Sequence, residues 1–379
     1  IKATVELMKE LAPHNQLLFV NSPYTFKDVI DGLRGKRNIA FRRALGLKNR
    51  VKTIQLNNGG VVHLLTPPIA VSVNFLPEGW LYQALLQLNG WLLKRSTLKA
   101  LKRLRMTDQL INIVAFNQAM GVTTGRRFNE QVLIYHCYDE IRGAHEWVRK
   151  HGIALENRLL KMVDGVIVTS QGLYNSKKDL CKTCFIVKNA ANFSLFSQGV
   201  HTRIDAEKIV GYIGTIDERL DYDLLQYLLI QMPDVKFVFV GRIITESGST
   251  VLHKFPNACF TGAKKPDELP GYLKTFSAGI IPFVKDDFTR GIYPMKINEY
   301  LAAGLPVIST DFSDLSDFDG TIRIVRDKTA FMECLQTELY TDTPEKRASR
   351  QDKARQNTWA IRAEELSDAI EKIEAGIVQ

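Results

Sequence analysis

The sequence predicts an α/β protein with two doubly wound, Rossmann-like domains, each built on a parallel sheet. Short apolar runs, typical of buried parallel strands, alternate with segments of helical spacing through both halves of the chain. The chain has 379 residues, which is enough for two domains with full hydrophobic cores. Its composition is 45% hydrophobic and 24% charged, as in globular proteins, and no apolar run approaches the length of a membrane span.

The first half of the chain begins with a helical pattern, at residues 3–12. A Rossmann-like half normally starts with a strand and a glycine-bearing loop, so we expect a first strand that precedes residue 1. The elements predicted after this helix are strands at 16–21, 59–65, 111–116 and 131–140, strands beginning at 164 and 184, and helices within 79–107 and at 153–163.

The second half repeats the alternation. A buried strand ends at Gly214, and a helix starts near Asp221, which we expect to be its N-cap. The remaining predicted elements are strands at 236–241, 258–262, 278–282, 306–310 and 322–325, and helices at 267–276, 294–304, 328–339 and 344–375.

The segment from Ala278 to Thr310 gives the clearest indication of a binding site. A helix from Pro294 to Gly304 lies between two predicted strands, so its N-terminus falls at the carboxyl ends of strands, where ligands bind in open α/β sheets. The free N–H groups there attract phosphate, and Lys296 and Glu299 share one helix face. A cation for phosphate beside a carboxylate for sugar hydroxyls suits a nucleotide sugar; an exposed Lys–Glu pair on an ordinary helix fits the spacing equally well.

Further candidates follow other strands. Gly214 and Thr215 let the backbone approach a diphosphate, and Arg242 ends the strand at 236–241. Arg219 offers another cation, but the acidic residues just before it are unusual in a phosphate loop. Asp139 and His136 lie at the end of the strand at 131–140, where either could accept a proton from an acceptor hydroxyl; the alternative for Asp139 is to cap the next helix.

The run R-x-x-x-P-x-K-x-x-E-Y-L-A-A-G-x-P-V, from Arg290 to Val307, resembles the donor-site segment of GT-B glycosyltransferases of bacterial exopolysaccharide and cell-wall polymer synthesis, such as xanthan glucuronosyltransferase-like and teichuronic-acid-type enzymes. The resemblance is strong over about 209–312 and fainter over 130–196. It implies that Glu299 holds the donor ribose and that Met295 and Lys296 face the diphosphate. Many retaining members carry a second glutamate where this chain has Gly291, so the resemblance leaves the stereochemistry open.

The resemblance also implies further roles and boundaries. The loop that includes Gly262 and Lys264 contacts the nucleotide base, Arg290 helps Lys296 to stabilise the leaving diphosphate, and Asp139 is the base if the reaction inverts. We expect a GT-B fold with an acceptor-binding domain at 1–200, a linker near 197–207, a donor-binding domain at 208–345, and a C-terminal helix at 346–379 that crosses back to the first domain. The two sheets would face each other across a cleft.

The charge is unevenly distributed. Residues 1–200 hold 28 Lys and Arg against 13 Asp and Glu, and no acidic residue occurs from Gly32 to Pro77 or from Gly79 to Thr107. Such asymmetry suggests an anionic partner. The segment 79–107, rich in Trp, Leu, Lys and Arg, suits a helix on an anionic membrane surface; the favoured alternative is a solvated helix whose apolar stripe packs into the core. No nucleic-acid-binding motif is present.

The sequence therefore predicts a metal-independent glycosyltransferase. It would transfer a sugar from a nucleotide diphosphate donor, a UDP-sugar by family frequency, to a glycan or lipid-linked acceptor, with no other cofactor. The alternatives are a nucleotide-sugar epimerase on the same fold and an inactive nucleotide-sugar or membrane-surface binding protein. Five scattered cysteines favour a reducing cytoplasm, with peripheral membrane association as an option.

Overall fold

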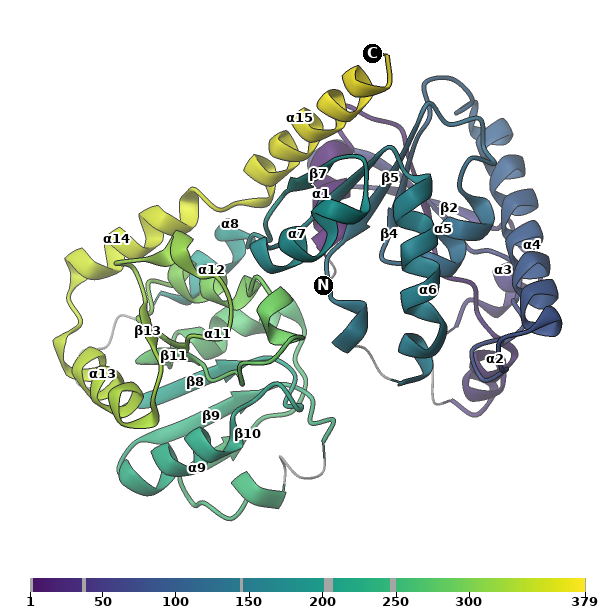
Figure 1. Ribbon diagram of the computed structural model, residues 1–379. Helices are drawn as coiled ribbons and strands as arrows, with labels where there is room; N and C mark the ends of the chain where they lie inside the picture. The colour runs from purple at the N-terminus through teal and green to yellow at the C-terminus, as the bar shows by residue number, and fades with distance from the viewer. Residues whose placement is uncertain (1–2, 36–38, 144–145, 201–206, 246–249, 379) are drawn as a thin grey trace. The chain divides into compact units, whose positions relative to one another are not determined.

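The computed structural model describes residues 3–35, 39–143, 146–200, 207–245 and 250–378 (Figure 1). The chain divides into two compact units, one made of Ile1–Val187 with Ala363–Gln379 and the other of Lys188–Arg362. This division falls before the linker predicted at 197–207, of which 201–206 lie outside the described residues. No helix in the described parts of the chain has the length and apolar character needed to cross a membrane.

The first unit contains two sheets. A four-stranded parallel sheet has the order β4-β5-β6-β7, and a separate sheet has the order β1-β3-β2, in which β1 is parallel and β2 antiparallel to β3. The strands are β1 (Leu17–Val20), β2 (Val51–Gln55), β3 (Val61–Leu65), β4 (Ile111–Ala115), β5 (Val132–Cys137), β6 (Gly165–Val168) and β7 (Cys184–Ile186). The parallel sheet agrees with the sequence, whereas the antiparallel hairpin of β2 and β3 departs from a purely parallel half.

The helices of the first unit cover these sheets. They are α1 (Ala3–Leu11), α2 (Phe26–Leu33), α3 (Phe41–Ala44), α4 (Trp80–Leu104), α5 (Gln118–Thr124), α6 (Glu146–Met162), α7 (Gln171–Lys177) and most of α15 (Trp359–Val378). Every residue of β5 and β6 is buried, as expected for central strands covered on both faces. The C-terminal helix packs on β6, where the Ile373 side chain fills the space above Gly165.

The second unit is one six-stranded parallel sheet with helices around it. Its strands are β8 (Ile209–Ile213), β9 (Lys236–Val240), β10 (Ala258–Phe260), β11 (Ala278–Ile281), β12 (Val307–Thr310) and β13 (Arg323–Val325). Its helices are α8 (Phe193–Phe196), α9 (Tyr222–Gln231), α11 (Leu269–Leu273), α12 (Met295–Ala302), α13 (Lys328–Thr341) and α14 (Pro344–Arg355). The Asp221 carboxylate accepts from the Leu224 N–H at 2.9 Å, which confirms the predicted N-cap of α9.

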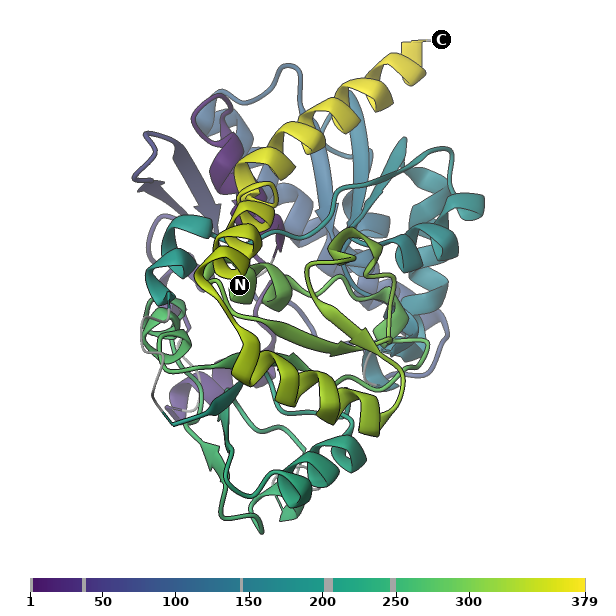
Figure 2. The same cartoon turned by 90° about the vertical axis from the view of Figure 1, so that its left-hand side faces the viewer.

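The helix predicted over 344–375 is two helices, α14 and α15 (Figure 2). The chain turns at Gln356 and Asn357, and Thr358 then forms a parallel bridge with Ala191, whose N–H donates to the Asn357 carbonyl at 3.3 Å. This tertiary contact takes the backbone out of helical geometry, although Trp359 resumes an amphipathic pattern directly afterwards.

Candidate functional site

The strand order of the second unit defines where a ligand would bind. The sheet runs β10-β9-β8-β11-β12-β13, so successive strands are added in one direction from β8 and in the other from β11. Ligands bind in open α/β sheets where the strand order reverses in this way, at the carboxyl ends of these two strands. Here the segment after β8 pairs with the segment after β11 through an antiparallel bridge between Leu220 and Phe283. The candidate residues after β8 and those at the start of α12 come from this part of the sheet.

The turn after β8 requires glycine for two reasons. Gly214 has φ +152°, and a Cβ added to it would lie 2.2 Å from the Lys296 Cε. A Cβ added to Gly241, after β9, would lie 1.7 Å from the Gly214 carbonyl oxygen. The two glycines thus let the ends of β8 and β9 approach each other and leave room for the Lys296 side chain beside the turn.

Lys296 lies in the first turn of α12 and extends toward this glycine turn. Its ammonium is 5.6 Å from the centroid of the Tyr212 ring and 5.5 Å from that of the Phe283 ring. The two aromatic side chains are themselves fully buried and fix the position of the cation. Within the described residues, no carboxylate forms an ion pair with the Lys296 ammonium, so a bound anion would supply its missing partner.

Electrostatics agree with this interpretation. Burial lowers the pKa of Lys296 to about 8, the charge of Arg219 lowers the pKa further, and Glu299 opposes both. Burial also raises the pKa of Glu299, against the effect of Lys296. Burial therefore disfavours both the Lys296 ammonium and the Glu299 carboxylate. A phosphate could offset this cost at Lys296, and hydroxyl donors could offset it at Glu299.

Arg219 is the residue that sequence reasoning undervalued. The structure places its guanidinium 5.6 Å from the centroid of the same Phe283 ring that Lys296 contacts. The acidic neighbour that argued against Arg219 orients it instead, because the Asp217 carboxylate accepts from its Nε at 2.8 Å and from its terminal nitrogen at 2.5 Å. The chain from Arg219 to Asp221 is itself held on the end of β11 by backbone bonds to Val284 and Pro282. Only this tertiary pairing brings Arg219 toward Lys296.

The other predicted donor residues are more dispersed. Thr215 belongs to the glycine turn, and its carbonyl accepts the Tyr212 hydroxyl at 3.0 Å; Met295 precedes Lys296 at the start of α12. Arg242 is exposed, but its carbonyl accepts the Ile216 N–H at 2.9 Å, which keeps it beside that turn.

Three predicted residues have no contact, within the described part of the chain, with the group formed by Lys296, Arg219 and the two rings beside them. Gly262 and Lys264 follow β10 on the edge of the sheet, and Lys264 lies over the Tyr272 ring at 5.6 Å. Arg290 is 60% exposed and pairs with Asp287 at 3.1 Å, one turn before it. A role for these residues stays a prediction.

The catalytic candidates His136 and Asp139 lie in the first unit, at the end of β5. His136 is buried, its Nδ1 is 2.9 Å from the Thr4 hydroxyl, and burial lowers its pKa to about 4. A base with so low a pKa is poorly matched to proton transfer near neutral pH. Asp139 is half-buried, and its carboxylate accepts the N–H of Glu140 at 3.0 Å. Of the two, the surroundings of Asp139 suit a general base better.

Glu140, the next polar residue, belongs to a buried structural network. Lys177, only 4% exposed, bonds to Glu156 at 2.7 Å and to Glu140 at 3.3 Å, and the Tyr135 hydroxyl donates to Glu156 at 2.7 Å. These buried charges are paired and hydrogen-bonded, which fixes α6 and α7 against β5. This network holds the loop that carries Asp139.

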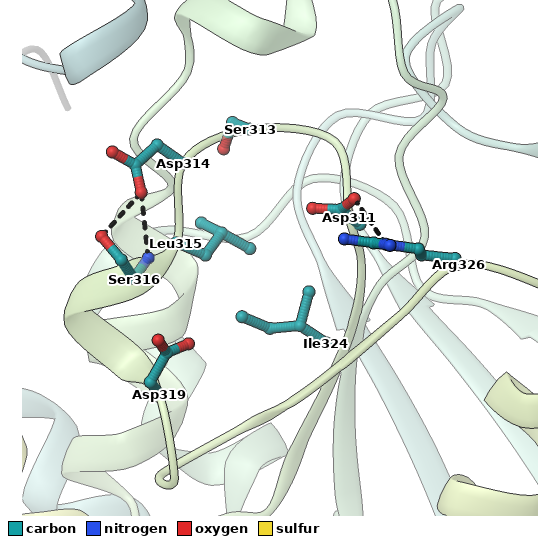
Figure 3. A pocket seen from close by; sticks show the side chains of 8 residues that line it. All are labelled: Asp311, Ser313, Asp314, Leu315, Ser316, Asp319, Ile324 and Arg326. Atoms are coloured by element: carbon teal, nitrogen blue, oxygen red, sulfur yellow. Dashed lines mark hydrogen bonds and ion pairs between the residues drawn. The ribbon is translucent and has the colours of Figure 1, made fainter.

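A cavity of about 430 Å³ lies at the carboxyl ends of β12 and β13 (Figure 3). Its lining includes three carboxylates, Asp311, Asp314 and Asp319, of which Asp311 pairs with Arg326 at 3.2 Å. This charge disfavours a diphosphate, so the cavity is a poorer candidate for a phosphate-binding site than the surroundings of Lys296. No group of three or more His, Cys, Asp or Glu side chains in the described part of the chain could hold a metal ion.

The chain is similar to proteins of known family and fold. Residues 207–340, which lie within the second unit, match the family model described as Glycosyl transferases group 1. The whole chain has the GT-B fold, as the sequence predicts. It matches the UDP-forming α,α-trehalose-phosphate synthase of Burkholderia vietnamiensis with a TM-score of 0.65, covering 97% of this chain and 100% of that one at 11% identity.

More particular relatives are found by sequence and by structure. The chain is 29% identical over 204 residues to the proposed teichuronic acid biosynthesis glycosyltransferase TuaH of Bacillus subtilis (strain 168), covering 48% of this chain and 51% of TuaH. It thus spans about half the length of that relative. Anabaena Alr3699/HepE, solved in complex with UDP, matches with a TM-score of 0.59 and 13% identity over 94% of this chain and 100% of that one.

Proposed function

We propose that this chain is a glycosyltransferase that transfers a sugar from a nucleoside diphosphate sugar to an acceptor hydroxyl in the synthesis of a cell-envelope polysaccharide. The observation that carries the proposal is the Lys296 ammonium, held without a carboxylate partner among the described residues against the Gly214 turn, at the carboxyl end of β8 where the strand order reverses. The group 1 domain supports the reaction class. The name of TuaH supports an envelope polymer as product, and the UDP complex of HepE supports UDP as carrier.

The donor would bind with its diphosphate at the glycine turn and the start of α12. Lys296 and Arg219 would neutralise the charge that develops on the leaving diphosphate, helped by the free N–H groups of α12. Glu299 would accept hydrogen bonds from the ribose hydroxyls. These groups supply the positive charge that the reaction needs, so we propose that transfer proceeds without a metal ion.

The acceptor side would be formed by the first unit. We propose Asp139 as the general base if the reaction inverts, because its carboxylate is half-buried at the end of β5. We further propose that the acceptor is a glycan or a lipid-linked sugar and that the protein works at the inner surface of a membrane. The excess of basic residues in the first half of the chain supports an anionic partner there.

The first experiment measures binding of UDP, GDP and ADP to the full chain by calorimetry in the presence of a chelator. We expect micromolar affinity for one nucleotide, lost in Lys296→Ala and kept in Lys254→Ala, which removes an exposed lysine elsewhere in the second unit. Absence of binding to all three nucleotides would refute the proposed donor site.

The second experiment measures turnover with nucleotide sugars, with and without lipid-linked acceptors. A glycosyltransferase releases the nucleotide at a rate that depends on the acceptor. Conversion of the sugar without an acceptor would instead indicate an epimerase, and donor binding without any turnover would indicate a binding protein.

A further inference from the structure

Helix α4 has two apolar faces, and only one of them is used by the fold. Its inner face is buried: Tyr82 stacks on His151 with ring centroids 4.0 Å apart, and Leu86 packs into the core of the first unit. Gly90 allows a close crossing with α5, since a Cβ there would lie 2.4 Å from the Thr123 Cβ. The favoured expectation, that an apolar stripe of this segment packs into the core, is thus confirmed for the inner face.

The outer face of α4 carries large apolar side chains that no core contact requires. Trp80 is 80% exposed and Trp91 is 53% exposed, and Leu81, Leu88 and Leu98 are exposed as well. Leu81, Leu88, Trp91 and Leu98 are seven, three and seven residues apart, and Trp80 lies eleven residues before Trp91, so all five share one helix face, opposite to the buried set. Figure 1 shows α4 along the outer edge of the first unit. Isolated exposed apolar residues are common, but two tryptophans on one such helix face are not.

The same outer face is strongly cationic. Arg95 and Lys102 continue the row of Leu88, Trp91 and Leu98, and the Arg95 guanidinium lies 5.5 Å from the centroid of the Trp91 ring. The other basic residues toward the end of the helix are Lys94, Lys99, Arg103 and, directly after it, Arg105. The segment 79–107 contains no acidic residue, and no ion pair within the described residues involves these cations.

We propose that the outer face of α4 is a binding surface for an anionic lipid bilayer. Trp and Leu would enter the boundary between headgroups and acyl chains, and Lys and Arg would contact the lipid phosphates. Over its 25 residues the helix is about 37 Å long, so it would lie flat along the surface. A second copy of this chain is a poorer occupant, because two such faces would bring like charges together.

This inference does not rest on the proposed function, since lipid binding is measured without any nucleotide. It adds to that function a means of bringing the enzyme to an acceptor held in the membrane. The same surface would explain why the basic residues are concentrated in the first half of the chain.

The test is cosedimentation of the full chain with vesicles of phosphatidylcholine, with and without phosphatidylglycerol. We expect binding only to the anionic vesicles and a steep loss of binding at high salt. Lys99→Ala with Lys102→Ala should reduce the partition coefficient roughly 25-fold, from about a factor of five for each cation. The matched control, Lys254→Ala with Lys274→Ala, removes two exposed lysines of the second unit and should change it little.

A second pair of variants tests the apolar residues. Leu88→Ser with Trp91→Ser should reduce binding to anionic vesicles by about tenfold or more, whereas Ile230→Ser, at a residue that is 58% exposed on α9, should not. Equal binding to neutral and anionic vesicles would overturn the proposal, as would undiminished binding of the Leu88 and Trp91 variant. A dimer in solution that the same variant makes monomeric, with vesicle binding unchanged, would assign the face to a second copy instead.

Discussion

The lowered pKa of Lys296 makes the affinity for a nucleoside diphosphate depend on pH in a defined way. In the free protein this pKa is about 8, because burial and Arg219 disfavour the ammonium. A bound diphosphate would restore the pKa toward its ordinary value of 10.5 or above. Binding then requires the protonated form: affinity is full below pH 8 and falls as the pH rises through 8. The two pKa values give a loss of about tenfold, or about 1.4 kcal/mol, between pH 7 and pH 9.

Calorimetry in two buffers of different ionisation enthalpy measures this effect directly. At pH 8 the binding of one nucleotide should take up about half a proton, and near pH 9 about one. Lys296→Arg is the matched comparison, because a guanidinium stays charged over this range and should give a nearly flat profile. Any titration of the nucleotide itself appears equally in both proteins. A wild-type affinity that stays constant to pH 9, or an equal slope in the arginine variant, would remove Lys296 from contact with the diphosphate.

Three further outcomes are expected. Glu299→Ala should weaken nucleotide binding by about 1–3 kcal/mol through lost hydrogen bonds, measured by calorimetry against Glu333→Ala, an exposed glutamate of α13; equal affinities would contradict a ribose contact. Gly241→Ala should destabilise the second unit by about 1–3 kcal/mol in urea unfolding, because its Cβ meets the carbonyl of the glycine turn, whereas Gly271→Ala has open space and should be neutral or stabilising. His136 has a pKa of about 4 in the folded protein and about 6.5 in the unfolded chain, so the free energy of unfolding should fall by up to about 3 kcal/mol as the pH drops from 6.5 to 4. His136→Asn should lose this part of the acid sensitivity in urea unfolding curves measured at several pH values. An unchanged pH profile in the variant would assign the acid sensitivity to other groups.

The glycine turn connects stability to function in the second unit. The close approach of Gly241 to Gly214 leaves no room for a side chain at Gly241, and the absence of a Cβ at Gly214 leaves the space that the Lys296 side chain fills. A change at either glycine is therefore expected to disturb nucleotide binding and folding together. Separating the two effects needs both an unfolding curve and a binding isotherm for the same variant.

Much of this protein could be predicted from local sequence. The strand–helix alternation predicts the parallel sheet of the second unit, because fully buried strands have continuous apolar runs. The helix that carries Lys296 and Glu299 could be placed from its own residues, since Pro294 and Gly304 mark its ends. These signals are local: they depend on backbone preferences and on hydrophobic spacing within a few residues.

Other features were decided only by tertiary contacts between distant segments. Arg219 looked compromised beside an acidic residue, but the ion pair with Asp217 and the ring of Phe283 position it near Lys296. The break between α14 and α15 depends on the bridge from Thr358 to Ala191, which no local pattern contains. Sequence spacing determined that α4 is a helix rich in apolar and basic residues, while only packing within the first unit decided which of its two apolar faces is buried and which one, with its tryptophans and cations, remains at the surface.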